Sequence, residues 1–258
     1  MKERPPLEYW LLLDVGNTTL HVGVGNARRV VWSVDVPVGN EARLKKVVSA
    51  ATRDFGVKNG VLCSVAPKNK RQAMPVVRSF GLRIIELTAL KNCLIEIDYP
   101  EPKTIGADRL ASSIAAKSLF GAPVVSVDFG TAVTFDVVNR KGAYIGGVIA
   151  PGLAAMTDYL YERTAKLPRV QLKEPNRVIG RSTKEAMLSG AVYGYRGLVA
   201  EVLSQVTQEL GRPSPRVVAT GSYAHLIANS LPVICQTVPD LTLEGLRLIA
   251  TRYLAGAS

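Results

Sequence analysis

The sequence has few of the residues that metal-binding and hydrolytic sites most often use. Its 258 residues include two histidines, His21 and His225, and three cysteines, Cys63, Cys93 and Cys235. With so few histidines, we expect neither a histidine-based metal site nor a Ser-His-Asp triad. The cysteines are odd in number and too scattered for a CxxC or metal-ligand pattern. We therefore expect three buried thiols in a reducing compartment.

Long apolar runs are also missing. No stretch approaches the ~18–20 apolar residues that a membrane span requires. The run YWLLL, residues 9–13, is too short for the core of a signal peptide and is not followed by a cleavage site of small residues. We therefore expect a cytoplasmic protein without membrane partners. The segment MKERPP, residues 1–6, is the one expected loose end.

Positive charge exceeds negative charge, with 32 Lys and Arg against 21 Asp and Glu and a formal net charge of +11. Such an excess can indicate a nucleic-acid partner. The basic residues, however, are spread over NARRV, RLKK, KNKRQ and RPSPR, and no aromatic residues lie between them. This distribution is typical of a solvated surface that also attracts anionic substrates, so we do not expect a nucleic-acid partner.

Hydrophobic periodicity predicts the same order of elements twice. Residues 9–36 and residues 122–152 each read as three strands joined by short turns. The predicted helices are 40–56, 68–81, 106–121, 153–168, 182–211, 224–231 and 241–256, and the further strands are 57–67, 82–88, 214–222 and 232–238. A βββαβα order that occurs twice predicts two similar lobes, residues 1–120 and residues 121–258.

Each strand trio begins with a turn that carries an acid, a glycine and a threonine. The first is DVGNT, residues 14–18, and the second is DFGT, residues 128–131. Glycine lets the backbone approach a ligand closely, successive N–H groups can form an anion-binding concavity, and a carboxylate can hold a hydrated Mg²⁺. Two such turns facing each other would hold a polyphosphate and its cation. The plain alternative is two ordinary turns between hairpin strands.

Each turn offers its own set of candidate groups. In the first turn these are the carboxylate of Asp14 and the N–H groups of Gly16, Asn17, Thr18 and Thr19. In the second turn they are Asp128, Gly130, Thr131 and Thr134.

The two turns resemble the phosphate motifs of the acetate kinase, sugar kinase, Hsp70 and actin superfamily, and within it the chain resembles type III pantothenate kinases over nearly its whole length. The further motifs that carry the resemblance are SVAP (64–67), Tyr99 and Pro102 before GADR (106–109), GGVIAPG (146–152), TAKLP (164–168) and STKEAMLSG (182–190). The resemblance implies an α/β fold of two similar ribonuclease H-like lobes, the actin-like ATPase fold, each lobe a mixed sheet flanked by helices.

The resemblance also implies a reaction and a set of site residues. The reaction is ATP-dependent phosphorylation of pantothenate to 4′-phosphopantothenate, the first step of coenzyme A biosynthesis, with Mg²⁺ and a monovalent cation, K⁺ or NH4⁺. Asp108 matches the catalytic acid and Asp128 the ligand of the monovalent cation, and Asp14 is expected to hold Mg²⁺ through water. The implied pantothenate-binding residues are Tyr99, Gly106, Ala107, Asp108, Arg109 and Thr183. The implied ATP-binding residues are Asp14, Val15, Gly16, Asn17, Thr18, Thr19, Leu20, His21 and Thr131.

The family is dimeric, with the active site at the subunit interface, and the resemblance implies that Thr183 comes from the partner subunit of a homodimer. The apolar helical segments 153–167 and 185–203 are the expected interface material, and lobe core is their alternative role.

Several site residues have ordinary structural interpretations as well. Asp108 would be favoured by the dipole of a helix that begins near it, and Tyr99 could simply cap the core. Ser182 or Thr183 could cap the following helix. In GGVIAPG, the pair of glycines at 146–147 indicates a β-bulge or a close backbone approach.

The sequence departs from the family pattern at two positions. His21 stands where many relatives carry lysine, and an imidazole would hold triphosphate less firmly than an ammonium group. Ser222 follows Gly221 where the family usually has a second glycine, so we expect weak or promiscuous nucleotide use.

Two other functions are compatible with the same fold. One is a non-catalytic accessory factor for transcription, and the other is a different phosphotransferase or phosphohydrolase. A non-catalytic relative has no need of four particular charged residues together, and all four are present: Asp14, Asp108, Arg109 and Asp128.

Overall fold

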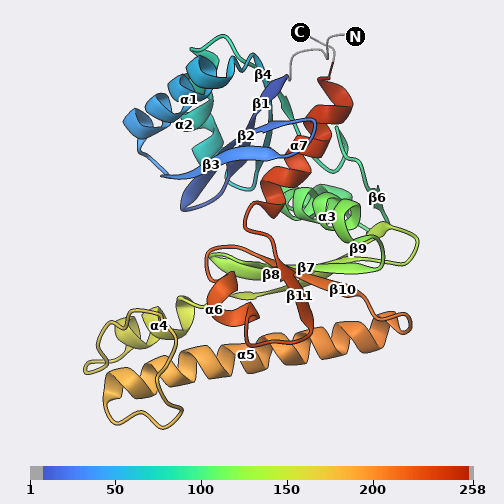
Figure 1. The fold of residues 1–258 in the computed structure, drawn as a ribbon. Helices are drawn as coiled ribbons and strands as arrows, with labels where there is room; N and C mark the ends of the chain where they lie inside the picture. Colours follow the sequence, from blue (N-terminus) through green and yellow to red (C-terminus); the bar gives the residue numbers. More distant parts are fainter. Residues whose placement is uncertain (1–7, 256–258) are drawn as a thin grey trace, which may run out of the picture. The chain divides into compact units, whose positions relative to one another are not determined.

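A computed structural model describes residues 8–255 of the chain. The predicted loose end at residues 1–6 lies outside the described residues. The chain forms two compact units, the first running up to Leu119 and resuming at Asp240, and the second running from Phe120 to Pro239. Figure 1 labels most of the elements of both units.

The first unit is built on a five-stranded sheet with the order β3-β2-β1-β4-β5. Strand β1 pairs antiparallel with β2 and parallel with β4. The five strands are β1 (Tyr9–Val15), β2 (Thr19–Asn26), β3 (Val30–Pro37), β4 (Asn59–Ser64) and β5 (Arg83–Glu86); the short strand β6 (Glu96–Ile97) is not part of this sheet. The helices are α1 (Glu41–Phe55), α2 (Pro67–Arg78), α3 (Ala107–Phe120) and α7 (Leu241–Tyr253), with a 3-10 turn at Pro102–Thr104.

Strand β1 is covered on both faces. Leu11, Leu13 and Val15 pack in one core cluster with side chains of α1 and α2. Side chains alternate along a strand, so Leu12 and Asp14 point to the opposite face. Helix α7 packs on that face against β1, β2 and β4. Asp14 therefore stands at the end of a buried strand, on the face that α7 covers.

The second unit repeats this design. Its strands lie in the order β11-β10-β7-β8-β9, and the long helix α5 and the short α6 contribute to one core cluster with the sheet (Figure 1 shows α5 in orange). The strands are β7 (Val124–Phe129), β8 (Ala132–Val138), β9 (Ala143–Pro151), β10 (Arg216–Thr220) and β11 (Ile234–Thr237), and the helices are α4 (Ala155–Arg163), α5 (Thr183–Leu210) and α6 (Ala224–Ala228).

The two sheets share one topology. In each, the first strand pairs antiparallel with the second and parallel with the fourth, which are β2 and β4 for β1 and β8 and β10 for β7. The predicted pair of similar α/β lobes is therefore confirmed.

The predicted division into residues 1–120 and 121–258 differs from the structure in its last segment. From Asp240 the chain returns to the first unit. Leu243 and Leu246 of α7 are fully buried. A Cβ at Gly245 would overlap the carbonyl of Ala111 in α3, so α7 packs closely against the first unit. Periodicity shows that a helix has an apolar face, but it does not show which sheet that face covers.

The expectation of three buried thiols is correct for Cys63 alone. Cys93 is half-buried and Cys235 is exposed. Cys235 lies in β11, at the edge of its sheet, where a side chain can face solvent. Within residues 8–255, none of the helices has the length and apolar character that crossing a membrane would take.

Candidate active site

Three polar side chains gather at the end of β1. The strand register pairs Asp14 with His21 of β2 and with Cys63 of β4. Because directly paired residues of neighbouring strands point to the same face, all three lie on the face that α7 covers. The thiol of Cys63 donates a hydrogen bond to Oδ1 of Asp14, with an Sγ–Oδ1 distance of 3.3 Å.

Cys63 connects this cluster electrostatically to α3. Burial raises the pKa of the Cys63 thiol well above its ordinary value, and the charges of Asp14 and Asp108 raise it further. The thiol therefore stays protonated and acts as a hydrogen-bond donor to the Asp14 carboxylate. The geometry agrees: Gly106, just before α3, lies against Val65, whose backbone N–H donates to the carbonyl of Val15 at the end of β1 with an N–O distance of 3.3 Å.

Asp108 is folded back over Gly106 at the start of α3. Its Oδ1 accepts a hydrogen bond from the backbone N–H of Arg109 at 2.7 Å. A Cβ at Gly106 would lie 2.5 Å from the same oxygen and 3.1 Å from Cγ1 of Val65, so a larger residue at this position would displace the Asp108 carboxylate.

The pKa of Asp108 is raised, because burial outweighs the backbone hydrogen bond and the positive charge of Arg109. An acid placed only to complement a helix dipole would have a lowered pKa. The direction of the shift therefore favours the functional interpretation over the purely structural one, since buried carboxyl groups with raised pKa values are typical of proton-transfer sites.

The first turn is fixed by backbone hydrogen bonds. The N–H of Gly16 donates to the carbonyl of Thr19 at 3.0 Å. This N–H closes the turn and already has a partner, so the N–H groups of Asn17, Thr18 and Thr19 are the stronger candidates for binding an anion. Val15 and Leu20 are buried in the core of the unit, so only their backbone atoms remain for a ligand.

His21 is held by Asp240, the residue before α7, with an Nε2–Oδ1 distance of 3.2 Å. Burial alone would lower the pKa of His21, but the hydrogen bond to Asp240 and the nearby charges of Asp35 and Asp14 outweigh it and raise the pKa. The imidazole therefore carries more positive charge at neutral pH than an ordinary histidine, and a carboxylate neutralises that charge.

A cavity of ≈ 500 Å³ opens where β4 and β5 end. Its wall includes Gly106 and Ala107, two of the predicted pantothenate-binding residues. The remaining wall is Ser64, Val65, the segment 86–90 and the segment 103–105. Tyr99, another of the six predicted pantothenate-binding residues, is 37% exposed in the loop that leads to this segment.

Two glycines surround the second turn. The register pairs Asp128 with Thr134 of β8 and with Thr220 of β10. A Cβ at Gly221 would overlap the Asp128 carboxylate, and a Cβ at Gly152 would overlap the backbone of residues 130–131. Gly221 therefore makes room for the Asp128 side chain, and the backbone of Thr131 lies directly against Gly152. Ser222 is exposed next to Gly221.

The GGVIAPG segment contains the predicted bulge. The register of β8 and β9 shifts between Val137 and Val138, opposite Gly146, whose φ is +124°. At the other end of the segment, the hydroxyl of Tyr195 in α5 donates to the carbonyl of Pro151 at 3.1 Å. Helix α5 therefore anchors the strand end that supports the second turn.

Ser182, and not Thr183, caps α5. Its Oγ accepts a hydrogen bond from the backbone N–H of Glu185 at 3.2 Å. Thr183 is the first helical residue and is exposed. The capping role that was the alternative for Thr183 is thus filled by its neighbour.

The two expected interface helices differ in exposure. The apolar side chains of α5 mostly belong to the core of the second unit, so that segment is largely lobe core. Helix α4 and the loop after it expose large apolar side chains instead, among them Tyr159 at 63% and Ile179 at 82%. The exposed members of this group are Met156, Tyr159, Tyr161, Val178 and Ile179.

The sequence did not predict two residues that donate hydrogen bonds to Asp14 and to the first turn. One is Cys63, which was interpreted only as a buried thiol. The other is Asn69 in α2, which lies in a basic stretch interpreted as surface; its side-chain amide donates to the carbonyls of Gly16 and Asn17. No local pattern identifies either residue, because the contacts depend on the parallel pairing of β1 with β4.

The raised pKa of Asp108 predicts a pH-dependent stability difference. The folded chain holds this proton more tightly than the unfolded chain, so ionising Asp108 destabilises the fold as the pH rises above the ordinary value of 3.8 through the raised value. We expect Asp108→Asn to unfold at a higher temperature than wild type at pH 8, with the difference shrinking toward pH 4. Thermal unfolding of both proteins across this range is the measurement. An Asp108→Asn variant that is less stable than wild type at pH 8, or whose gain in unfolding temperature does not depend on pH, would contradict a raised pKa for Asp108.

Solved structures share the fold of this chain. A Campylobacter jejuni protein described as a conserved member of the Baf transcriptional activator family superposes with a TM-score of 0.61 at 18% identity, covering 94% of this chain and 98% of that chain. Component A of (R)-2-hydroxyglutaryl-CoA dehydratase from Acidaminococcus fermentans superposes with a TM-score of 0.54 at 13% identity, covering 97% and 100%. At these identities the likeness shows the fold alone, and it confirms the predicted actin-like ATPase fold.

Sequence comparison is more specific. The type III pantothenate kinase from Akkermansia muciniphila is 44% identical over 245 residues, which cover 93% of this chain and 98% of that protein. The sequence model of the type III pantothenate kinase family matches residues 10–205. The chain therefore belongs to the type III pantothenate kinase family.

Proposed function

We propose that this protein transfers the γ-phosphoryl group of ATP to the primary hydroxyl of pantothenate and so forms 4′-phosphopantothenate, the first step of coenzyme A biosynthesis. Family membership supports the class of reaction. The observation that carries the chemistry is the half-buried carboxylate of Asp108, with its raised pKa, near the end of β1.

Asp108 is the general base of this proposal. Its raised pKa brings the carboxylate closer to the working pH, where it accepts a proton more readily. As the pantothenate oxygen attacks the γ-phosphorus, its proton passes to Asp108, and the bond between the γ-phosphorus and the bridging oxygen of ADP breaks. The proton then leaves Asp108 for solvent. The rate enhancement comes mainly from positioning and charge neutralisation.

Arg109 follows Asp108 directly and is the cation that would hold the pantothenate carboxylate. A guanidinium group binds a carboxylate in a bidentate manner, which fixes orientation as well as charge. Gly106 and Ala107 line the cavity beside it, and Tyr99 comes from the preceding loop. In this proposal Thr183 of the partner subunit completes the binding site.

The backbone of the first turn would hold the phosphates, with the N–H groups of Asn17, Thr18 and Thr19 as donors. His21 and Thr131 are the further candidate residues for ATP. Among residues 8–255 there is no cluster of three or more His, Cys, Asp or Glu side chains that could hold a metal. This fits Mg²⁺, which binds through one or two carboxylates and otherwise keeps waters and substrate phosphates. Asp14 is the carboxylate that would hold it, and the cation supplies neutralisation of phosphate charge.

Asp128 is the proposed ligand of a monovalent cation. Its neighbours on the adjacent strands are Thr134 and Thr220, whose hydroxyl groups donate to the Asp136 carboxylate and to the carbonyl of Pro239. A hard cation such as K⁺ or NH4⁺ is compatible with such an oxygen-rich environment.

A homodimer is the proposed assembly. Exposed apolar side chains on α4 and in the loop after it form a group that a subunit interface would bury. Thr183 follows this loop in the chain, so an interface here would bring Thr183 to a partner.

Activity assays test the reaction and the base together. With ATP and Mg²⁺, wild type should phosphorylate pantothenate and not other small alcohols, and Asp108→Asn should lower kcat by about 10²- to 10⁴-fold. A coupled ADP assay gives both values, and Asp98→Asn, in the loop before Tyr99, is the matched control. Turnover confined to another alcohol would point to a different phosphotransferase. No turnover of any alcohol would favour the non-catalytic accessory factor for transcription. Near-normal turnover by a folded Asp108→Asn variant would show that Asp108 is not the general base.

The monovalent cation site predicts a response that depends on Asp128. Wild type should be activated by K⁺ or NH4⁺ relative to Na⁺, and Asp128→Asn should lose this activation by about tenfold or more, the loss of an interaction of about 1.4 kcal/mol. Initial rates at constant ionic strength measure this effect. Asp54→Asn, an exposed acid at the end of α1, should keep the activation. Equal activation of Asp128→Asn and wild type would place the cation elsewhere.

Mixed dimers test whether Thr183 acts across the interface. Asp108→Asn and Thr183→Ala subunits should each be nearly inactive alone. A mixed dimer of the two would hold one intact site out of two, so purified mixed dimers should show about half of wild-type activity. Co-expression of differently tagged subunits followed by tandem purification gives the measurement. If the purified mixed dimers remain inactive, each site is built within one subunit.

A further inference from the structure

Three successive backbone carbonyl groups of the first turn, those of Gly16, Asn17 and Thr18, each accept a hydrogen bond from a neighbouring segment of the unit. The side-chain amide of Asn69 donates to the carbonyl of Gly16 at 2.9 Å and to that of Asn17 at 3.1 Å. The backbone N–H of Val38, just after β3, donates to the carbonyl of Thr18 at 3.0 Å. One side chain and one backbone group therefore fix the peptide planes of the whole turn.

Fixing these carbonyls also fixes the N–H groups of the turn. In a trans peptide unit the C=O and the N–H point in opposite directions. When Asn69 holds the carbonyls of Gly16 and Asn17 toward α2, the N–H groups of the two residues that follow them point away from α2. Val38 sets the N–H of Thr19 in the same way. These are the donors that an anion-binding concavity requires.

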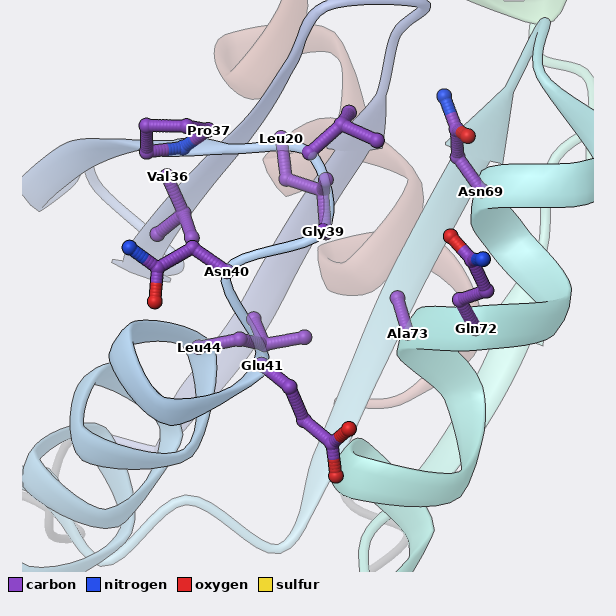
Figure 2. A pocket seen from close by; sticks show the side chains of 11 residues that line it. Leu20, Val36, Pro37, Gly39, Asn40, Glu41, Leu44, Asn69, Gln72 and Ala73 are labelled. Carbon is purple, nitrogen blue, oxygen red and sulfur yellow. The ribbon is translucent and has the colours of Figure 1, made fainter.

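Asn69 reaches the turn because of where α2 begins. The helix starts at Pro67, directly after β4, and β4 runs parallel to β1, so the first turn of α2 comes to lie beside the end of β1. Figure 2 shows Asn69 and Gln72 on α2, on one side of a cavity of ≈ 170 Å³, with Asn40, Glu41 and Leu44 on the other side. Asn69 lines this cavity and also donates to the carbonyl groups of the first turn, so it lies between the cavity and the turn.

We propose that Asn69 is a positioning residue for the phosphates of the nucleotide: it orients the N–H groups of Asn17 and Thr18 through the carbonyls of the preceding peptide units. This role rests on the proposed function of the turn as a phosphate site. Asn69 does not touch the reacting atoms in this proposal. Its effect should therefore appear in nucleotide binding and leave pantothenate binding unchanged.

The test compares two substitutions at this position. Asn69→Ala removes the amide, and Asn69→Leu removes both donors while keeping a similar volume, which separates hydrogen bonding from packing. Loss of two neutral hydrogen bonds corresponds to about 5- to 100-fold. We expect both variants to raise the KM for MgATP and the Kd for MgADP, measured by calorimetry, by this factor. The KM for pantothenate should stay within about twofold.

Gln72→Ala is the matched control, because Gln72 lines the same cavity about one turn further along α2. It should leave the KM for MgATP unchanged. A purely structural role for Asn69 would lower the unfolding temperature of Asn69→Leu without changing its Kd for MgADP, and that result would overturn the inference.

The outcomes also separate this inference from the proposed function. A wild-type protein that binds MgADP but does not phosphorylate pantothenate would remove the proposed function, while the calorimetric comparison of the Asn69 variants would still decide the role of Asn69. A wild-type protein that binds no adenine nucleotide would overturn both.

Discussion

The double pairing of β1 is the constraint on which the candidate site depends. Antiparallel pairing with β2 requires a tight turn after Asp14, and parallel pairing with β4 brings Cys63 and the start of α2 to the same edge. As a result, Cys63 donates a hydrogen bond to Asp14, and Asn69 of α2 donates to the carbonyl groups of the turn. Strand β7 is paired in the same two ways with β8 and β10, and so Asp128 meets Thr134 and Thr220 at the equivalent position.

Much of the fold could be predicted because the information is local. The apolar run of β1, the alternation in β2 and β3, the glycine after α1 and the serine before α5 each act through neighbours in the chain. Each marks an element where the structure has one. Prediction was wrong where a choice between distant surfaces decided the result. Helix α7 packs on the first sheet and not the second, and Cys235 faces solvent because β11 is an edge strand.

The candidate site divides in the same way. Asp14 could be found because an acid at a strand end is visible in the sequence, whereas Asp108 was assigned through the resemblance of its GADR segment to the family. The pKa of Asp108 could not be predicted, since it depends on how far α3 buries the carboxylate. Asn69 carries no local pattern at all, and its two hydrogen bonds exist only because β4 delivers α2 to the turn. The backbone N–H of Gly16 was predicted to bind an anion because glycine allows close approach of the backbone, but in the hairpin this N–H donates to the carbonyl of Thr19.

Electrostatics give the backbone of the first turn particular importance. His21 could have supplied a cation to the phosphates, but Asp240 holds it at 3.2 Å, and Asp14 and Asp35 lie on neighbouring strands. The positive charge of the imidazole is therefore largely compensated within the unit. A triphosphate at this turn would meet carboxylates as well as donors, so its binding depends on metal cations and on correctly directed N–H groups. Where the side-chain charge is compensated, the orientation of the peptide planes carries more of the affinity, and Asn69 and Val38 set that orientation.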